Sequence, residues 1–473
     1  MRLSHDRPVG AAVFDEPNLV SAAGLVPVVA LARGAGLRLL GDEHLSVPTD
    51  KGANAGLKLT SLVAGMVAGA DSIDDMALLR HGGMGKVFDA CYAPSTLGSF
   101  LRAFSFGHVR QLDAVASRLL GGLAAATPLL AGVGGQVLLD IDDTIIEVHG
   151  YGKQGSGYGY SGVRGLNALL ATVTTTRAAP VVVAQRLRRG SCGSPRGAAR
   201  LVADALATLR RVRDGARSTP DSAPGRVLVR ADSAFYGHAT VSAAIKAGAD
   251  VSVTVRMDKR VKAAIAAITH DAWRATSTPT PCSTKTAAGG SRVPRSGEIE
   301  FTAFTSKKKA QQVPGRLVVR RIPDLNHKAA AGQSTLLDTW RFHAFFTTSH
   351  RGALDTVAAD KTHRGHAIIE QVHADLKNSA LAHLPSGKFA ANAAWLVLAV
   401  MAFNLTRAAA ASSGPQLARA ATATIRRTLI GVPARTASSA RRLTLHLPTH
   451  WPWQTPWTEL FTRACGPPGT ATP

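Results

Sequence analysis

Apolar residues in the first quarter of the chain recur at the three- and four-residue spacing of helices. The spacing is clearest over residues 19–40 and 57–67, and Pro94, with the Ser and Thr after it, begins a further helix towards Phe104. Residues 17–127 show no strand-like alternation. We therefore expect a helical N-terminal domain over residues 1–130. Short helices in a basic protein are compatible with a helix-turn-helix DNA-binding domain, although most short helices do not bind DNA.

The pattern changes to that of strands from residue 135. Short turns separate three expected strands at residues 137–148, 168–176 and 181–187, and a Gly- and Tyr-rich hairpin at 150–162 joins the first two. Sequential strands with short connections predict an antiparallel start to a sheet. Helices then alternate with strands, which predicts a βαβ unit, in the order 198–214, 227–232, 240–247 and 250–256.

The fold class that these patterns predict is α/β, with a mixed sheet. Residues 259–338 are rich in Ser, Thr, Lys and Pro with scattered β segments, and we interpret them as a β-rich insertion. The core resumes with a strand at 341–347 and a long helical region at 362–405, broken near Pro385. The expected divisions are 1–130 (helical N-terminal domain), 131–258 (core, first part), 259–338 (insertion), 339–407 (core, second part) and 408–473 (basic C-terminal helical tail).

Charge is the unusual feature of the composition. The 473 residues hold 55 Lys and Arg against 31 Asp and Glu, which gives a net charge of +24 and a pI near 10.7. This balance favours a nucleic acid as partner. A simpler explanation of the high Arg content is a GC-rich genome, whose codon usage enriches Arg whether or not the protein contacts DNA. The 45% hydrophobic content is that of a globular protein, and the length allows two or three domains.

The sequence gives no sign of export or of a membrane span. Its first residues lack the apolar segment of a signal peptide. The most apolar stretch, 389–405, falls short of the roughly 20 residues that span a bilayer, so we expect a buried helix there. Four widely spaced cysteines form no C-x-x-C pair, which argues against a zinc knuckle or a disulfide framework. These features predict a soluble, cytoplasmic protein, associated with the nucleoid if it binds DNA.

Three aspartates interrupt an apolar strand at Asp140, Asp142 and Asp143. Burying a carboxylate among Leu and Ile residues is unfavourable by several kcal/mol unless something compensates its charge. Alternate residues of a strand share a face, so Asp140, Asp142 and Thr144 form one oxygen-rich row while Asp143 points the other way. Hard cations such as Mg²⁺ take oxygen ligands of this kind. The strand therefore predicts half of a metal site.

Two later acidic residues extend this pattern. Asp232 ends a Val-rich strand, at the position where open α/β sheets place their sites. Glu370 lies in a helical stretch whose polar residues recur every three or four positions and would share one face, namely His363, His366, Glu370, His373 and Lys377. Taken singly, Asp232 reads as a helix cap, and Glu370 with Lys377 as a solvated face. Together the three acids are the set expected to hold two Mg²⁺ ions for an in-line phosphoryl transfer.

With these residues the chain resembles the DDE transposases of bacterial insertion sequences, which have an RNase H-like core. Relatives of insertion sequence four carry Tyr, two residues, Arg, three residues, Glu, six residues and Lys. The same spacing occurs here as His363, His366, Glu370 and Lys377, and the family named for insertion sequence thirteen-eighty looks nearest. The resemblance covers almost the full length, through segments at 69–75, 140–144, 230–235, 383–395 and 451–453.

The resemblance implies cut-and-paste transposition, with cleavage at inverted-repeat ends and strand transfer into a target. It implies Asp142, Asp232 and Glu370 as the catalytic, metal-binding triad, with Mg²⁺ as the metal and Mn²⁺ as a substitute. Asp140 and Thr144 take supporting roles. The implied partners are double-stranded DNA, as terminal repeats and as target, and a second copy in a homodimer.

The resemblance also implies residues that contact DNA. Lys377 would bind a phosphate, His363 and His366 would occupy the places of the family's Tyr and Arg, and Trp340 or Trp273 would stack on a flipped base. Unlike Arg, His is neutral over much of the physiological pH range, so the two replacements leave a catalytically decayed copy open. The Arg-dense segment 186–217 and the basic tail would add phosphate contacts independent of sequence.

A different enzyme class competes for the acidic strand. Asp140-x-Asp142-x-Thr144 after an apolar strand matches the nucleophile motif of haloacid dehalogenase-like phosphatases, with Asp140 as nucleophile and Asp142 as general acid and base. Those enzymes usually place the motif on the first strand of the domain, and a charge of +24 is not expected of a small-phosphate hydrolase. A DNA-binding protein without activity is the third reading. Dependence of DNA nicking on Glu370 would separate the three.

Overall fold

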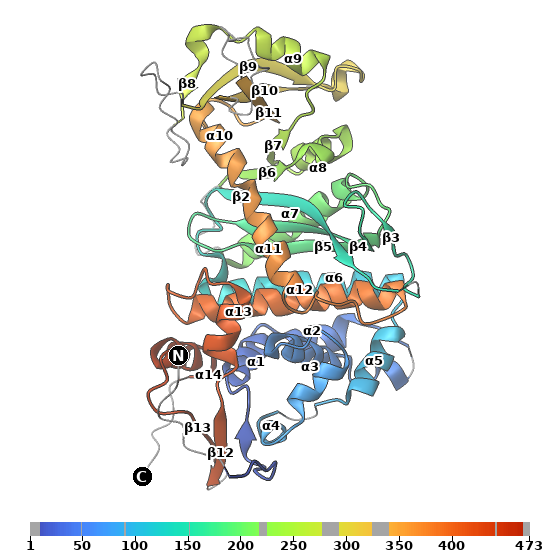
Figure 1. Cartoon of the computed structure of the whole chain (residues 1–473), viewed down its shortest axis with the longest axis vertical. Coiled ribbons are helices and arrows are strands. Elements are labelled where there is room, and N and C mark those ends of the chain that lie inside the picture. The colour runs from blue at the N-terminus through green and yellow to red at the C-terminus, as the bar shows by residue number, and fades with distance from the viewer. Residues whose placement is uncertain are drawn as a thin grey trace.

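The computed structural model describes residues 10–48, 50–88, 91–150, 152–216, 225–276, 293–323, 340–439 and 442–466. These residues form a mixed α/β fold with one large sheet, a helical N-terminal part and a small C-terminal sheet (Figure 1). Much of the predicted insertion, at 277–292 and 324–339, lies outside the described residues.

The N-terminal part is largely helical, as the apolar spacing predicts. The single helix expected over residues 19–40 is wrong, because residues 19–20 form a short strand and Gly36, with its positive φ, separates two helices. Pro94 occupies the first turn of its helix, where a missing N–H leaves no hydrogen bond unmade. The longest helix of this part begins at Phe106 with a capping box, in which Ser105 and His108 each accept a hydrogen bond from the other's main-chain N. The helices are α1 (Leu25–Gly34), α2 (Leu37–His44), α3 (Ala55–Ala68), α4 (Met84–Val87), α5 (Pro94–Arg102) and α6 (Phe106–Ala126).

The large sheet has ten strands among the described residues, in the order β3-β4-β2-β6-β7-β11-β10-β9-β8, with β5 paired to β4. Their bounds are β2 (Val137–Glu147), β3 (Gly157–Tyr158), β4 (Arg164–Thr174), β5 (Val181–Arg189), β6 (Val227–Ala231), β7 (Asp250–Thr254), β8 (Arg274–Ala275), β9 (Arg295–Ala303), β10 (Val313–Pro323) and β11 (Trp340–Thr347). The strands β2, β4 and β5 pair antiparallel, which confirms the predicted start of the sheet.

The predicted βαβ unit is also present. Strand β6 pairs parallel with β2, and β7 pairs parallel with β6. The connecting helices are α7 (Ala198–Ala216) and α8 (His238–Lys246). Strands β9 and β10, from the predicted insertion, continue the same sheet through β11, which pairs with both β10 and β7. The helix α9 (Lys259–Ala266) follows β7, and its first turn is capped by Asp258.

Helix α12 (Phe389–Ser412) lies between the sheet and the N-terminal helices, where it packs on β5, α6 and α3 (Figure 1). Asn404 fixes it to β5 by accepting a hydrogen bond from the main-chain N of Val182 and donating one to the Val182 carbonyl. Among the described residues it is the one helix long and apolar enough to cross a membrane, and 89% of its most apolar window is buried in the protein. The predicted buried helix is confirmed, although at 24 residues it is longer than the stretch we expected.

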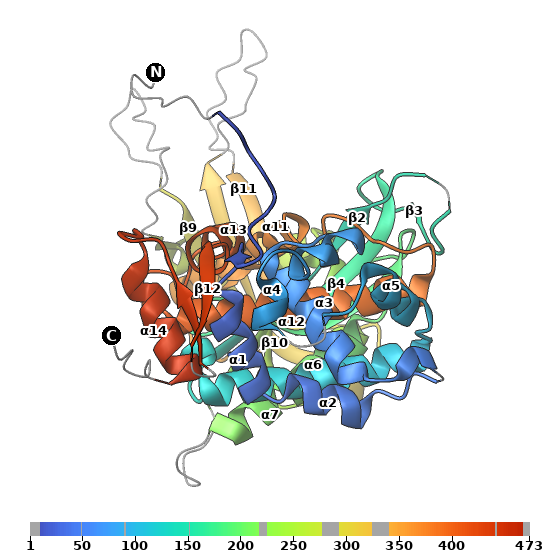
Figure 2. The same ribbon diagram turned by 90° about the horizontal axis from the view of Figure 1, so that it is seen from below.

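The C-terminal region corrects the predicted helical tail. Besides the helices α13 (Thr422–Ile425) and α14 (Gln454–Cys465), it contains the strands β12 (Ala434–Ser439) and β13 (Arg442–His446). These pair as a hairpin, and β1 (Leu19–Val20) adds a third strand beside β12. Helix α14 packs on α1 with Trp457 and Leu460 buried (Figure 2). The beginning and the end of the described chain therefore share one core.

Candidate active site

Two aspartates lie level with each other where the parallel pairing of β2 and β6 ends. The last paired residues are Asp140 of β2 and Arg230 of β6. Asp142 and Asp232 each follow two residues later, so the register places them at the same end of the strand pair. The negative charge of Asp232 helps to raise the pKa of Asp142, as expected for two carboxylates that repel each other. The structure thus brings together the two predicted strand-borne acids.

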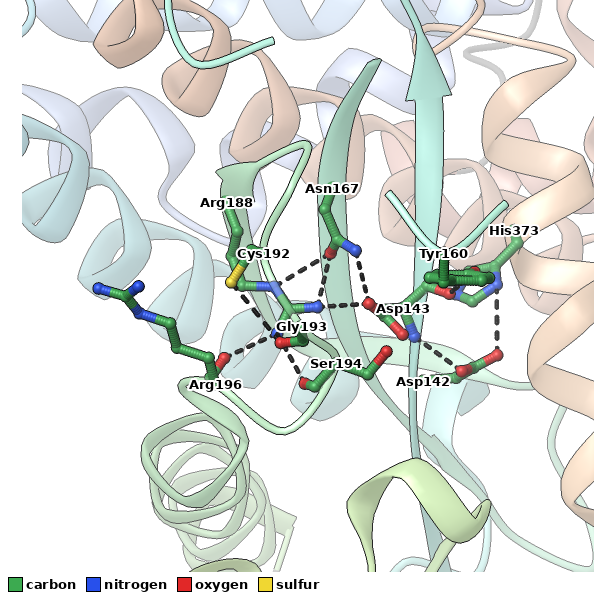
Figure 3. Close-up of polar contacts among 10 residues, drawn as sticks. All are labelled: Asp142, Asp143, Tyr160, Asn167, Arg188, Cys192, Gly193, Ser194, Arg196 and His373. Carbon is green, nitrogen blue, oxygen red and sulfur yellow. Dashed lines mark hydrogen bonds and ion pairs between the residues drawn. The ribbon is translucent and has the colours of Figure 1, made fainter. Parts of the chain in front are cut away.

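Asp142 is half-buried and has few hydrogen-bond donors around it. Its Oδ1 accepts a hydrogen bond from the main-chain N of Asp143 at 2.8 Å, and the Nδ1 of His373 lies 3.8 Å from its Oδ2 (Figure 3). Burial raises the pKa of Asp142 to about 6, while the bond from Asp143 and the positive charge of His366 oppose that rise. The surrounding protein groups therefore offset only part of the cost of burying the negative charge of Asp142.

Asp232 begins a short 3₁₀ helix, η4 (Ser233–Phe235), immediately after β6. Its Oδ1 accepts a hydrogen bond from the main-chain N of Ala234 at 3.0 Å. The side chain is open to solvent on one side, yet the protein around it displaces enough water to raise its pKa. Asp232 therefore caps the 3₁₀ helix, as the purely structural interpretation predicts. Its carboxylate is also close enough for its charge to act on Asp142.

Asp140 serves a different purpose from Asp142, although both lie on the same face of β2. Its carboxylate is fully buried and accepts two hydrogen bonds from Arg230, from Nε and Nη2, each at 2.7 Å. The Nδ1 of His366 lies 3.1 Å from its Oδ1. The same guanidinium donates to the carbonyls of Thr362 and Gly365. Asp140 thus anchors Arg230 and His366 beneath the site.

Asp143 points to the opposite side of the strand, as the alternation predicts. Its Oδ2 accepts hydrogen bonds from Asn167 Nδ2 and Arg188 Nη2, both at 2.5 Å (Figure 3). Arg188 also donates to the carbonyls of Ser194 and Arg196, each at 2.7 Å, and so fixes the loop before α7. Sequence reasoning assigned Arg188 to a DNA-facing segment, whereas its side chain is buried in this network.

Other arginines of the Arg-dense segment also have acidic partners. Asp204 of α7 accepts hydrogen bonds from Arg186 at 2.8 Å, from Arg200 at 3.1 Å and from Arg110 of α6 at 3.1 Å. This cluster joins the N-terminal helices to the sheet. Part of the segment therefore contributes to the fold through ion pairs, and Arg217 lies outside the described residues.

Glu370 is exposed in the first turn of α11 (Ile368–Lys377). It follows His366 and precedes His373, whose rings contact Asp140 and Asp142, and α11 packs on β2. Within the described ranges, no three His, Cys, Asp or Glu side chains are grouped closely enough to hold a metal ion. The charge of Asp232 thus acts on Asp142, while Glu370 does not complete a group of three with these two acids in the described structure.

A comparison with known families accounts for this arrangement of acids on strands and a helix. The family described as Transposase DDE domain group 1 matches residues 2–464, nearly the whole chain. The chain belongs to this family. A search of curated proteins finds no match.

Membership makes the protein a transposase, an enzyme of DNA cleavage and strand transfer whose substrate is DNA. Its mixed α/β sheet is consistent with the RNase H-like fold of DDE transposases. The phosphatase alternative is overturned, and the environment of Asp140 agrees. A nucleophile must reach its substrate, whereas Asp140 is sealed from solvent and paired with Arg230.

The prediction that the polar residues from His363 to Lys377 share one face of a single helix is wrong. The helix α10 (Thr356–Arg364) ends before the 3₁₀ turn η7 (Gly365–Ala367), and α11 begins after it. His363 lies at the end of α10 and contacts strands β7 and β11 rather than the acidic strand. Its ring lies between the hydroxyls of Ser252 and Thr254, at 2.9 and 3.0 Å, and stacks on Phe345 with centroids 4.0 Å apart. Burial lowers the pKa of His363 to about 3, so the imidazole is neutral.

The remaining predicted DNA contacts occupy two separate places. Lys377 ends α11 and lines a groove together with Thr144 of β2. Trp340 begins β11, and the guanidinium of Arg321 lies 4.7 Å from its ring and 4.3 Å from the ring of Trp273. Trp273 is buried in the hydrophobic core, while Trp340 is half-buried. Their contacts with DNA remain predictions.

The donor set of the transposase site fits a hard divalent cation. Asp142 and Asp232 present carboxylate oxygens at one place, and their mutual repulsion is the feature that such a cation relieves. DDE transposases generally use divalent metals. Close by, the Nε2 of His373 is buried without a hydrogen-bond partner, so its Nδ1 makes the contact that orients this ring towards Asp142.

Proposed function

We propose that this transposase cuts its element from donor DNA at the terminal inverted repeats and joins the freed 3′ ends to a target. Asp142, Asp232 and Glu370 would hold two Mg²⁺ ions, with Mn²⁺ as a substitute. The observation that carries the proposal is the register of β2 and β6, which sets Asp142 level with Asp232. Glu370 is the third ligand because it lies in α11 between two histidines that contact the acidic strand.

The metal ions, when bound, supply the charge that activates the attacking oxygen and stabilises the leaving oxygen. The side chains around them have other tasks. Asp140 and Arg230 hold the turn that carries His366, which keeps that ring beside the carboxylates. Thr144 continues the polar face of β2 towards Lys377, whose ammonium would bind a phosphate of the substrate.

The finer assignments extend the family membership. We propose that the chain belongs with the insertion sequence four relatives, nearest the thirteen-eighty family, on the spacing of His363, His366, Glu370 and Lys377. The divisions at 130, 258, 338 and 407 remain our proposal, as do the homodimer, helix-turn-helix contacts in the N-terminal part and a cytoplasmic, nucleoid-associated location.

Cleavage of a duplex that carries the element's own terminal repeat tests the triad. We expect Asp142→Asn, Asp232→Asn and Glu370→Gln each to lower the cleavage rate at least about 100-fold in Mg²⁺, because each removes a charged ligand. Removal of Mg²⁺ by a chelator should abolish cleavage by the wild type. Glu43→Gln, a change to an exposed acid of α2, is the matched control and should cut normally.

The outcomes separate the alternatives. Equal cutting by the wild type and the three variants would refute the triad. If the wild type binds the repeat without cleaving it, the protein is a catalytically decayed copy. His363 and His366 would then fail to replace the Tyr and Arg of the family. Loss of activity in Glu370→Gln alone would leave the two strand-borne acids without a catalytic role.

A further inference from the structure

The second half of α11 is held by a carboxylate that has no part in the proposed metal site. Asp375 lies five residues after Glu370, and its side chain is 16% exposed. Its Oδ2 accepts hydrogen bonds from Arg407 Nη2 of α12 at 3.1 Å and from the main-chain N and the Oγ1 of Thr422, each at 3.2 Å. Donors from two other elements therefore meet at one oxygen of the helix that carries Glu370 (Figure 1).

Arg407, the charged donor, is buried inside the protein. Its guanidinium also donates to the Ala420 carbonyl and lies 5.1 Å from the ring of Phe403, while its Nε is buried without a hydrogen-bond partner. Burial lowers the pKa of Arg407, and the negative charge of Asp375 opposes that fall. A buried positive charge on α12 thus has its carboxylate partner on α11.

The contacts of α11 lie on opposite sides of its axis. Its buried face consists of Ile369, Val372, His373 and Leu376. At 3.6 residues per turn, His373 is at one edge of this face and Asp375 lies beyond the other edge, about 160° away around the axis. His373 faces Asp142 of β2, whereas Asp375 is bound to α12 and to the start of α13. The two contacts together fix the rotation of the helix, and the direction of Glu370 follows from that rotation.

A buried ion pair is a poor way to add stability but a good way to set an orientation. Apolar side chains of similar volume often leave a protein equally stable or more stable when they replace such a pair. They pack in several arrangements, however, whereas a carboxylate with a guanidinium and two further donors satisfies its hydrogen bonds over a narrow range of angles. The pair of Asp375 with Arg407 is therefore better suited to fix the rotation of α11 than to stabilise its packing.

We propose that Asp375, held by Arg407 and Thr422, is a positioning residue that sets the rotation of α11 and so the direction from which Glu370 approaches the two strand-borne acids. This role rests on the proposed function, because it takes Glu370 to be the third metal ligand. Asp375 acts only through Glu370. Since Thr422 begins α13, the same hydrogen bonds make the C-terminal region part of what orients the active site.

A paired change tests this role without leaving a lone charge inside the protein. Asp375→Leu together with Arg407→Met replaces both charged side chains by apolar ones, and we expect a Tm within about 5 °C of the wild type. Electron paramagnetic resonance of free Mn²⁺, in a titration of the full-length protein, measures metal binding directly. The paired variant should bind Mn²⁺ at least about fivefold more weakly than the wild type does. Thr422→Val, which removes only the hydroxyl donor, should weaken binding by about twofold and provides the same test if the paired variant does not fold.

A second background shows whether the effect passes through Glu370. Glu370→Gln removes the proposed ligand and should itself weaken Mn²⁺ binding. Added to Glu370→Gln, the paired change should weaken binding by less than about twofold, because the direction of a side chain that no longer binds metal has no consequence. Asp204→Leu is the control, since the Asp204 carboxylate accepts hydrogen bonds from three arginines away from α11. It should lower the Tm and leave Mn²⁺ binding unchanged.

The positioning role is overturned if the folded paired variant binds Mn²⁺ as the wild type does, or if the paired change weakens binding equally with Glu and with Gln at position 370. Neither result would affect the proposed ligands if Glu370→Gln weakens Mn²⁺ binding. Unchanged binding in Glu370→Gln would instead contradict the proposed function, and the positioning role would fall with it.

Discussion

Burial keeps His363 neutral, whereas a histidine that binds a DNA phosphate would be protonated. The unfolded chain binds a proton at this imidazole below its ordinary pKa of 6.5, whereas the folded protein resists protonation until about pH 3. Burial is the main cause, and the positive charges of His366 and Arg230 add to it. Because the unfolded state takes up the proton first, His363 lowers the stability of the fold as pH falls from 6.5.

We expect this residue to remove about 2 kcal/mol from the free energy of unfolding between pH 7.5 and pH 5. His363→Gln should be less stable at pH 7.5, since it loses the stack on Phe345, but its stability should fall by about 2 kcal/mol less over the same interval. Urea unfolding at the two pH values measures both quantities. His343→Gln, at an exposed site on β11, should behave like the wild type, and an equal fall in all three proteins would contradict the prediction.

At this scale, strand periodicity predicts part of the site correctly. Alternation along β2 separates Asp143 from Asp140 and Asp142, and the contacts of all three agree with it. The same pattern could not assign a partner to each acid, because ion pairs such as those to Arg188 and Arg230 join residues far apart in sequence. Residue type and spacing also gave no sign that the ring of His363 is used inside the protein.

Between α10 and α11, the turn η7 depends on one buried guanidinium. Arg230 donates to Asp140 and to the carbonyls of Thr362 and Gly365, so a single side chain ties β2 and β6 to both helices. A Cβ at Gly365 would lie 2.9 Å from Arg230 Nη1. Arg230 cannot move aside freely, because its other contacts are buried.

Gly365→Ala should therefore shift α11 rather than Arg230. The backbone at this residue is already helical, so the change affects packing and not the φ/ψ conformation. We expect a loss of stability of about 1–3 kcal/mol from overpacking. Cleavage should slow at least fivefold, with affinity for the terminal-repeat duplex within twofold of the wild type.

Gly85→Ala in α4 places a methyl group in open space and serves as the control. Hydrogen exchange over residues 365–372 would report the shift directly. Cleavage by Gly365→Ala at the wild-type rate would show that the position of α11 does not depend on this contact.

The elements themselves were predicted unevenly, for physical reasons. The long apolar strands and helices of the core carry strong periodicity, and they formed as expected. The strands β12 and β13 are short and largely exposed. Strand β12 is mostly polar, and the two alternating leucines of β13, Leu443 and Leu445, are too few to mark a strand in the sequence. No proline marks the break between α10 and α11 in the sequence. The break lies where Arg230 donates hydrogen bonds to the carbonyls of Thr362 and Gly365.

For the whole molecule, the net charge of +24 makes electrostatics the main term in DNA binding. Some of this charge is committed to the fold, as the pairs of Asp204 with Arg186 and Arg200 show. The remainder should still neutralise several phosphates and release their counterions. We expect affinity for any duplex to fall at least about 100-fold between 50 and 200 mM salt. Fluorescence anisotropy with the terminal repeat and a scrambled duplex measures the slope, and equal affinity at both salt concentrations would contradict the prediction.

The pairing of β1 with β12 has a consequence for how the enzyme is made. Helix α1 leaves the ribosome long before α14, so it lacks the cover of α14 until residues 454–465 have been synthesised. A stop codon or frameshift before residue 454 would thus expose apolar surface on α1 as well as remove α14. Products truncated there should be substrates for proteases rather than partly active transposases.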